Sequence, residues 1–196
     1  MLFKAVVPDN ITKLEFDFIK SINPLIKDEN SEAFGYIDIS PEAYNGEYQV
    51  GCCQTNVAKK IEKDGGRRLI GWCIWKSPVL LEAQYHHVWL SPEGKIEDTT
   101  PQSDKGKAIL FVIDPEQKDD GLPVQNKRKI LKNIPEVRKM IDLQDRLYFY
   151  RRRYQIPYSN NMQFPNQQEL QTFQKLQRDL QLTTIEIELF LNKTLK

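Results

Sequence analysis

Four strand candidates follow one another closely between residues 67 and 114, and three of them are apolar and rich in β-branched and aromatic residues. Only the dipeptide SP separates the first two, and only SPEG separates the second from the third, and both are turn-forming sequences. Strands joined by such short turns pair antiparallel. The sequence therefore predicts an antiparallel meander followed by one more buried strand, with segments 67–76, 79–90, 95–100 and 108–114.

A short amphipathic helix is expected immediately before these strands. In the stretch GCCQTNVAKKIEKDGG (51–66), Val57, Ala58 and Ile61 fall on one helical face, and lysines and Asp64 fall on the other. The two glycines that follow can adopt the positive φ that ends many helices. Cys53 is thereby placed in the first helical turn. Because the helix precedes the strands and does not alternate with them, the sequence predicts an α+β fold with this helix packed on the antiparallel sheet.

The N-terminal part and the C-terminal part complete the expected domain organisation. A strand is predicted at 2–7, a helix beginning at Asn10 or Thr12, and a short strand at 35–40. The second half becomes polar and then helical, with Thr183 or Thr184 beginning one or two further turns. The predicted parts are a core (1–114), a linker (115–133) and a helical extension packed on the core (134–196).

Charge and cysteine usage exclude several classes of protein. The chain has 28 basic and 27 acidic residues, so its net charge of +1 disfavours a large nucleic-acid-binding surface. No apolar run approaches the roughly 18 residues of a membrane span, and the N-terminus lacks the features of a signal peptide. We therefore expect a cytoplasmic protein without membrane contact. Three cysteines do not form a disulfide framework and would remain thiols in that compartment.

One of these thiols lies where it can be activated. A cysteine with an ordinary pKa of about 8.5 needs a helix N-terminus or an imidazolium nearby to react at neutral pH. Cys53 has the helix start, and the only two histidines, His86 and His87, lie on the second predicted strand of the meander. Antiparallel pairing across the SPEG turn brings Asp98 close to their level, although this carboxylate also suits a capping role in the turn DTTP. Strand alternation allows only one histidine to face Cys53, and the pattern does not choose between them.

The motifs CQTNV, GG, IGW, YHHVW and GKIEDTTP, in this order, resemble a set of small bacterial and phage proteins. Those proteins share a CxxNV, GG, GW, HxVW and DxTP pattern, which the chain matches over roughly residues 50–101. The resemblance selects Cys53, His86 and Asp98. Their order is also similar to that of papain-like hydrolases, including NlpC-type peptidases and transglutaminase-like enzymes. This similarity implies a papain-like core and a Cys-His-Asp site acting on an amide, isopeptide or ester bond of a peptide or protein.

Four further residues are candidates for the surroundings of this site. Gln49 and Gln54 could supply side-chain donors to an oxyanion, beside the backbone N–H of Cys53. Asn56 is better placed to stabilise the helix start than to take part in chemistry. Trp72 is interpreted as a core residue or a wall of the cleft.

Two alternatives to a thiol enzyme stay open. One is a zinc site that combines Cys53 with His86 or His87 and with Cys52 or Cys73, although these residues lack the CxxC spacing of strong zinc motifs. The other is a non-enzymatic interaction module based on the basic runs at 125–129 and 151–154, which are more often solvated faces. The leading interpretation requires neither a metal nor a cofactor, and the oligomeric state has no signature in the sequence.

Overall fold

The computed structural model describes residues 5–103, 105–116, 118–159 and 161–194. These form two compact units, which we call the sheet unit and the helical unit. The sheet unit contains residues 7–76 and 81–118, and the helical unit contains residues 5–6, 77–80 and 119–194. The predicted α+β class is confirmed.

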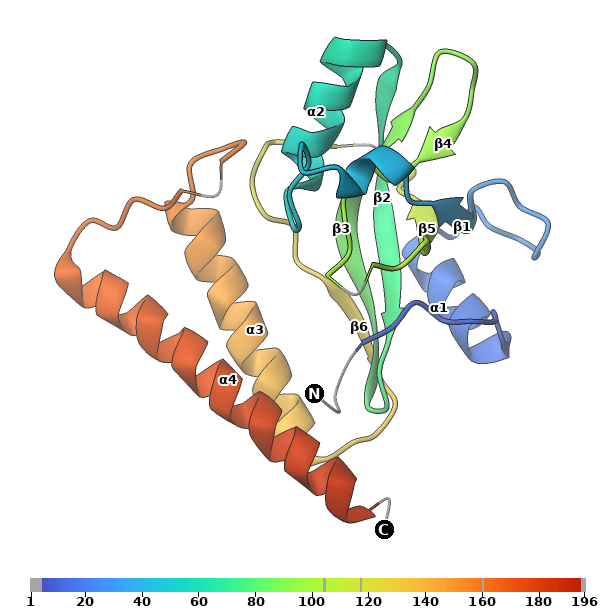
Figure 1. The fold of residues 1–196 in the computed structure, drawn as a ribbon. Coiled ribbons are helices and arrows are strands. Elements are labelled where there is room, and N and C mark those ends of the chain that lie inside the picture. The colour runs from blue at the N-terminus through green and yellow to red at the C-terminus, as the bar shows by residue number, and fades with distance from the viewer. Residues whose placement is uncertain (1–4, 104, 117, 160, 195–196) are drawn as a thin grey trace. The chain divides into compact units, whose positions relative to one another are not determined.

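The sheet unit is built on five strands, drawn in Figure 1, with the spatial order β1-β5-β2-β3-β4 and antiparallel neighbours throughout. Its meander runs through β2, β3 and β4 as the turn sequences predict. The last strand of the meander is shorter than expected, because only two residues of the segment 95–100 pair with β3. The bounds are β1 (Phe34–Asp38), β2 (Arg67–Lys76), β3 (Leu80–Leu90), β4 (Ile96–Glu97) and β5 (Ala108–Ile113).

The core of the sheet unit lies on the face formed by alternate residues of these strands. Val88 of β3 lies opposite Leu69 of β2, and Cys73 of β2 lies opposite Phe111 of β5. All four side chains are buried in one cluster, which extends to the single-turn helix η1 (Pro41–Tyr44). The alternation that predicted the strands therefore also identifies the face on which the core forms.

Helix α1 (Lys13–Ile22) begins at one of the two predicted positions. The Thr12 side chain accepts a hydrogen bond from the helix start, and the Glu15 side chain accepts one from the Thr12 backbone N–H, which together form a capping box. The strand predicted at 2–7 is wrong for the residues that the structure describes, since only Val6 of residues 5–7 is in a β-bridge. A short alternating run becomes a strand only where a neighbouring strand pairs with it. The rest of that prediction, residues 1–4, lies outside the described residues.

Glu15 also forms a partly buried ion pair whose effect on stability can be measured. Its side chain is inaccessible to solvent, and its Oε1 accepts a hydrogen bond of 2.7 Å from Lys76 Nζ. Burial alone raises the pKa of this carboxyl, but the hydrogen bonds from Lys76 and Thr12 outweigh it and lower the pKa to about 2. The folded state therefore gains stability above the ordinary pKa of about 4.3 and loses it as the pH falls toward 2.

We expect Glu15→Gln to lower the free energy of unfolding at pH 7 by on the order of 3 kcal/mol. Urea denaturation at pH 7, 4 and 3 should show the difference from the wild type shrinking as the pH falls. Asp17→Asn is the matched control, because Asp17 forms an exposed pair with Lys13 on the same helix and should change stability by less than about 0.5 kcal/mol. Equal losses in the two variants would contradict the assignment.

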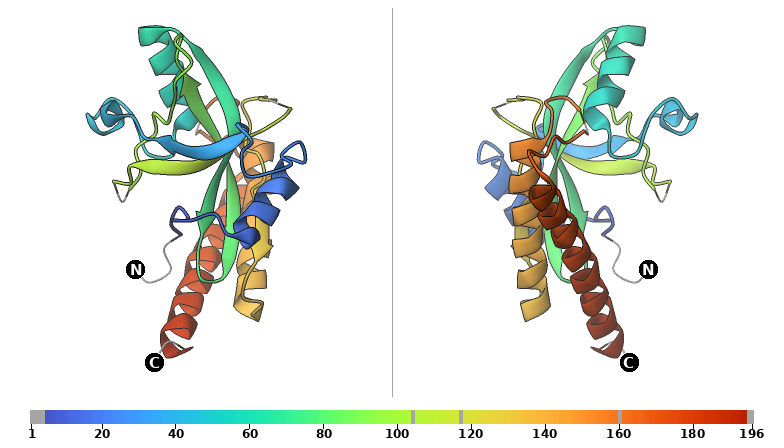
Figure 2. Two further views of the ribbon diagram at one scale, coloured as in Figure 1. Left: turned by 90° about the vertical axis from the view of Figure 1, so that its right-hand side faces the viewer. Right: turned by 90° about the vertical axis from the view of Figure 1, so that its left-hand side faces the viewer.

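The helical unit is a pair of helices, α3 (Pro135–Tyr154) and α4 (Gln167–Thr194), which run side by side in both views of Figure 2. Helix α3 begins with a proline, a residue favoured at the first helical position because its ring fixes a helical φ. Within residues 115–133, which the sequence predicts to be a linker, Lys127–Ile130 form strand β6. Two apolar clusters join the helices, and they contain Val137, Met140, Leu143 and Leu147 of α3 with Phe173, Leu176, Ile187 and Leu191 of α4.

The predicted helix start at Thr183 or Thr184 is wrong, since α4 continues without a break through both residues. The Thr184 hydroxyl donates to the Leu180 carbonyl one turn earlier, a bond that threonine forms inside helices. Thr183 is buried. None of the helices in the described part of the chain combines the length and the apolar character that crossing a membrane requires.

Candidate active site

Helix α2 (Cys53–Asp64) carries the candidate nucleophile in its first turn, as the sequence predicts. Its N-cap residue, Cys52, forms no side-chain capping bond. The helix ends at Gly65, which has a φ of 72°. Gly66 then passes so close to β3 that a Cβ would lie 2.4 Å from the Leu90 carbonyl oxygen. The glycine pair therefore both ends the helix and lets the chain enter β2 directly.

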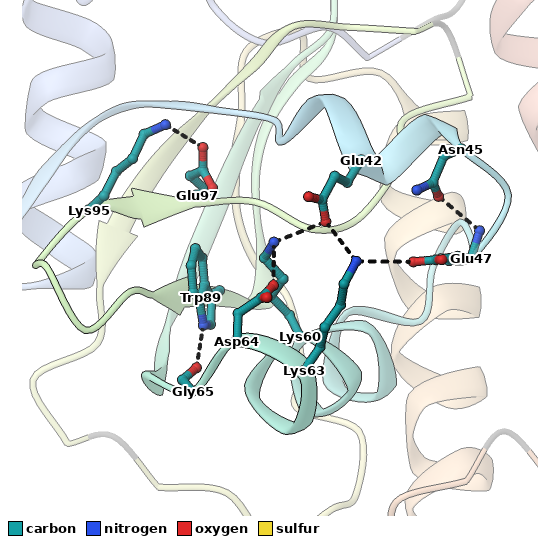
Figure 3. Close-up of polar contacts among 10 residues, drawn as sticks. All are labelled: Glu42, Asn45, Glu47, Lys60, Lys63, Asp64, Gly65, Trp89, Lys95 and Glu97. Atoms are coloured by element: carbon teal, nitrogen blue, oxygen red, sulfur yellow. Dashed lines mark hydrogen bonds and ion pairs between the residues drawn. The ribbon is translucent and has the colours of Figure 1, made fainter.

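The second half of α2 is fixed by a group of ion pairs, shown in Figure 3. The buried Lys60 ammonium lies 3.0 Å from Glu42 of η1 and 2.8 Å from Asp64. It also lies 4.8 Å from the ring centre of Trp89 on β3, whose indole N–H donates to the Gly65 carbonyl. These contacts hold α2 against η1 and β3, and thereby limit the positions that Cys53 can take.

His86 faces α2, whereas His87 faces the other side of the sheet. The rings of Tyr85 and His87 are in contact, with centroids 5.3 Å apart, and Trp72 contacts Tyr85 on the same side. His86 lies between these two residues in the strand and therefore points to the opposite face. There its imidazole is hydrogen-bonded to the Cys53 thiol. The structure thus makes the choice between the two histidines that strand alternation left open.

Asp98 lies on the other side of the His86 imidazole. The distance from His86 Nε2 to Asp98 Oδ2 is 3.0 Å, and both side chains are buried. In the β3–β4 register Trp89 lies opposite Glu97, so the next extended residue, Asp98, falls opposite Val88 and diagonal to His86. Asp98 therefore lies close to His86, as the antiparallel pairing across the SPEG turn predicts.

The Asp98 carboxylate both caps the turn that follows it and lies against His86, the two positions that the sequence suggests. Its Oδ1 accepts the Thr100 backbone N–H at 2.8 Å, which caps the turn, while Oδ2 faces His86. The Asp98 backbone is fixed as well, since its N–H donates to Asp38 and its carbonyl accepts from Ser40. A carboxylate with so little freedom can hold an imidazole in one orientation.

The electrostatics of the three groups favour an ion pair at Cys53. Burial raises the pKa of the Cys53 thiol, but the positive His86 imidazole, its hydrogen bond and the His87 backbone N–H together lower it. Burial lowers the pKa of His86, yet the negative charges of Asp98 and Cys53 raise it well above its ordinary value. The folded state therefore favours a thiolate beside an imidazolium. Cys53 is half-buried as a residue.

Asn56 connects the cysteine loop to the turn that holds the aspartate. This buried residue accepts the Gln49 backbone N–H at 3.1 Å and donates to the Gln49 carbonyl at 2.8 Å. Its amide also donates to Thr100 Oγ1 at 3.4 Å. The Thr100 N–H in turn binds the Asp98 carboxylate. Asn56 therefore helps to position both the loop before α2 and the turn that holds Asp98, a structural role as expected. The link to Thr100 has no signature in the sequence.

The other candidate residues lie in different surroundings. Gln49 is exposed, and its side-chain oxygen lies 3.7 Å from the Cys52 sulfur, not at Cys53. Gln54 is half-buried on the first turn of α2. Trp72 is a core residue on the face opposite His86, where its indole N–H donates to Asp114, so it is not a wall of the Cys53 site. Cys73 is buried, and burial raises its pKa well above the ordinary value.

Comparisons with known proteins found no relative of this chain. No protein-family model, no curated protein and no solved structure matches the chain. Within the described ranges, no three side chains of His, Cys, Asp or Glu are grouped as ligands for a metal ion.

Proposed function

We propose that the protein is a cysteine-dependent hydrolase or transferase with a papain-like core, acting on an amide, isopeptide or ester bond of a peptide or protein. The observation that carries this proposal is the buried His86 imidazole between the Cys53 thiol and the Asp98 carboxylate. A thiol whose pKa is lowered by a neighbouring imidazole is typical of reactive cysteine sites.

In the proposed reaction, the Cys53 thiolate attacks the carbonyl carbon of the substrate. A C–S bond forms, and the carbonyl π electrons move to the oxygen, where the Cys53 backbone N–H at the start of α2 is the proposed donor. The tetrahedral intermediate collapses, the bond to the leaving nitrogen or oxygen breaks, and the His86 imidazolium donates its proton to the leaving group. Cys53 then holds the acyl group as a thioester.

The second half of the reaction reverses these proton movements. Neutral His86 removes a proton from a water molecule, or from an acceptor amine, as this nucleophile attacks the thioester. The C–S bond breaks, the acid or amide product leaves, and the thiolate–imidazolium pair is restored. Asp98 remains ionised throughout and holds the imidazole in the orientation that serves both steps.

We expect Cys53 to be the most reactive thiol of the folded protein. Its alkylation by iodoacetamide, followed against pH with the modified cysteine located by mass spectrometry, should have an apparent pKa clearly below about 8.5. Cys53→Ser is the matched variant and should leave only slow labelling. Preferential labelling of Cys52 or Cys73, or an apparent pKa near that of a free thiol, would refute the assignment.

A second measurement separates the enzyme from the zinc alternative. Incubation with p-nitrophenyl acetate should release one equivalent of p-nitrophenol per chain in a burst, with a mass gain of one acetyl group located at Cys53. One zinc ion per purified chain, combined with alkylation that begins only after chelation, would instead establish a Cys/His zinc protein.

A further inference from the structure

We infer that a pocket of the sheet unit, separate from the Cys53 thiol, binds a small organic anion. The pocket has a volume of about 520 Å³, within the size range of small-molecule sites. Ile39, Pro41 and the ring of Tyr44 provide its apolar surface. The cationic residues that line it are Lys95, Lys105 and Lys107. This inference does not depend on the proposed enzymatic function.

The lysines outnumber the carboxylates of the pocket, which are Asp38 and Glu97. Lys95 and Glu97 neutralise one another at 2.5 Å, as Figure 3 shows. Lys105 and Lys107 are exposed, and neither has a carboxylate partner within the part of the chain that the structure describes. The carboxylate of Asp38 offsets one of these two charges, so the pocket keeps a net positive charge that favours an anionic ligand.

The loop that carries these two lysines is held in a defined shape. The Tyr44 hydroxyl donates to the Gly106 carbonyl at 2.6 Å and accepts the Gln102 backbone N–H at 3.2 Å. Lys105 itself has a φ of 57°, a left-handed conformation that costs free energy in a residue with a side chain. Strain of this kind persists only where surrounding contacts impose it. Here the two hydrogen bonds of the Tyr44 hydroxyl hold the loop, and thereby keep Lys105 and Lys107 at the pocket.

The same tyrosine determines what kind of anion fits. Tyr44 is 40% exposed although its hydroxyl is bound, and it lines the pocket beside Ile39 and Pro41. A bare inorganic ion would leave this apolar surface in contact with water. An organic phosphate or carboxylate can place its charged group at the two lysines and its apolar body on the ring.

The pocket is distinct from the site of the thiol. Successive residues of an extended chain point to opposite faces, so Glu97 lines the pocket while Asp98 faces His86. The two sites share a backbone connection, because Ile39 forms a parallel bridge with Asp98. Binding to the pocket can therefore be measured without reference to any reaction at Cys53, and its failure would leave the proposed chemistry untouched.

The test is a titration of the full chain with phenyl phosphate, followed by calorimetry and by NMR of the backbone amides. We expect saturable binding at millimolar concentration or below, with the largest shifts at residues 38–39 and 105–107. Phenol and inorganic phosphate, which each lack one half of the ligand, should bind at least about tenfold more weakly.

Two double variants of equal charge distinguish a site from general attraction. Lys105→Ala with Lys107→Ala should weaken phenyl phosphate binding by at least about tenfold. Lys13→Ala with Lys20→Ala removes two lysines from α1, outside the pocket, and should leave the affinity within about twofold of the wild type. Equal weakening in both, shifts centred elsewhere, or no saturation by 10 mM phenyl phosphate would overturn the inference.

Discussion

Replacing His86 with alanine is expected to slow the alkylation of Cys53 at pH 6 between about tenfold and a hundredfold. At this pH a thiol with the ordinary pKa of about 8.5 is only about 0.3% thiolate. In the wild type the imidazolium lowers the pKa of Cys53, so a larger fraction of the thiol is ionised at this pH. The loss is smaller than the change in thiolate fraction, because a thiolate of higher pKa is the better nucleophile.

The direction of the pH profile follows from the same charges. Without the imidazolium, burial still raises the pKa of Cys53, so the midpoint of alkylation should move up to about 8.5 or beyond. Above this midpoint the variant should react at least as fast as the wild type, because its thiolate has the higher pKa and is the better nucleophile. Because the truncation also leaves the buried Asp98 carboxylate without its imidazole, His86→Gln serves as a second variant with a polar side chain in the same place.

His87→Ala is the matched control. The His87 side chain packs against Tyr85 on the other face, whereas its contribution at Cys53 comes from the backbone N–H, which alanine retains. The alkylation rate at pH 6 should stay within about twofold of the wild type. Circular dichroism and a thermal melt establish that both variants fold. A larger effect from His87→Ala than from His86→Ala would place the base on the other face of β3.

The part of the site that could be predicted from the sequence is the part that local pattern determines. The amphipathic period and the closing glycines locate the start of α2 at Cys53, and strand alternation separates His86 from His87. The SPEG turn sets the register that brings Asp98 near them. Each of these features depends on residues that are neighbours in the chain, which is why sequence patterns are sufficient to find them.

What the sequence did not reveal depends on pairing between distant segments. The segment 95–100 is a strand for only two residues, because beyond Glu97 the backbone turns to Ile39 and Ser40, far away in the sequence. Trp72 is a large aromatic residue of the kind that lines clefts, yet its position in β2 places it against Asp114. Asn56 meets Thr100 only through the fold. Contacts of this kind carry no periodic signal.

Gly71 is another residue whose importance only the fold reveals. It lies within the IGW motif, directly opposite His86 in the β2–β3 ladder and opposite Ile113 in the β2–β5 ladder. A Cβ added to it would lie 2.2 Å from the Val112 carbonyl oxygen and 2.4 Å from the ring of Phe111. The absence of a side chain at this position therefore allows Phe111 to fill the core beside the strand that carries His86.

We expect Gly71→Ala to lower the free energy of unfolding by about 3 kcal/mol or more, near the upper end of the range for overpacked cores. The penalty is large because the closest atom belongs to the backbone of β5, so β2 and β5 would have to separate along their ladder. Urea denaturation at pH 7 measures the loss, and failure to obtain folded protein is its extreme form.

Gly35→Ala is the control that isolates this clash. Gly35 also lies in a strand that pairs with β5, opposite Phe111, but a Cβ there meets no atom within 4 Å. Alanine at this position also reduces the conformational freedom of the unfolded chain, so stability should stay equal or rise by up to about 1 kcal/mol. Similar losses in the two variants would mean that glycine is needed for strand backbone geometry in general. A loss confined to Gly71→Ala would assign it to the contact with Val112 and Phe111, because only this glycine has atoms where its side chain would lie.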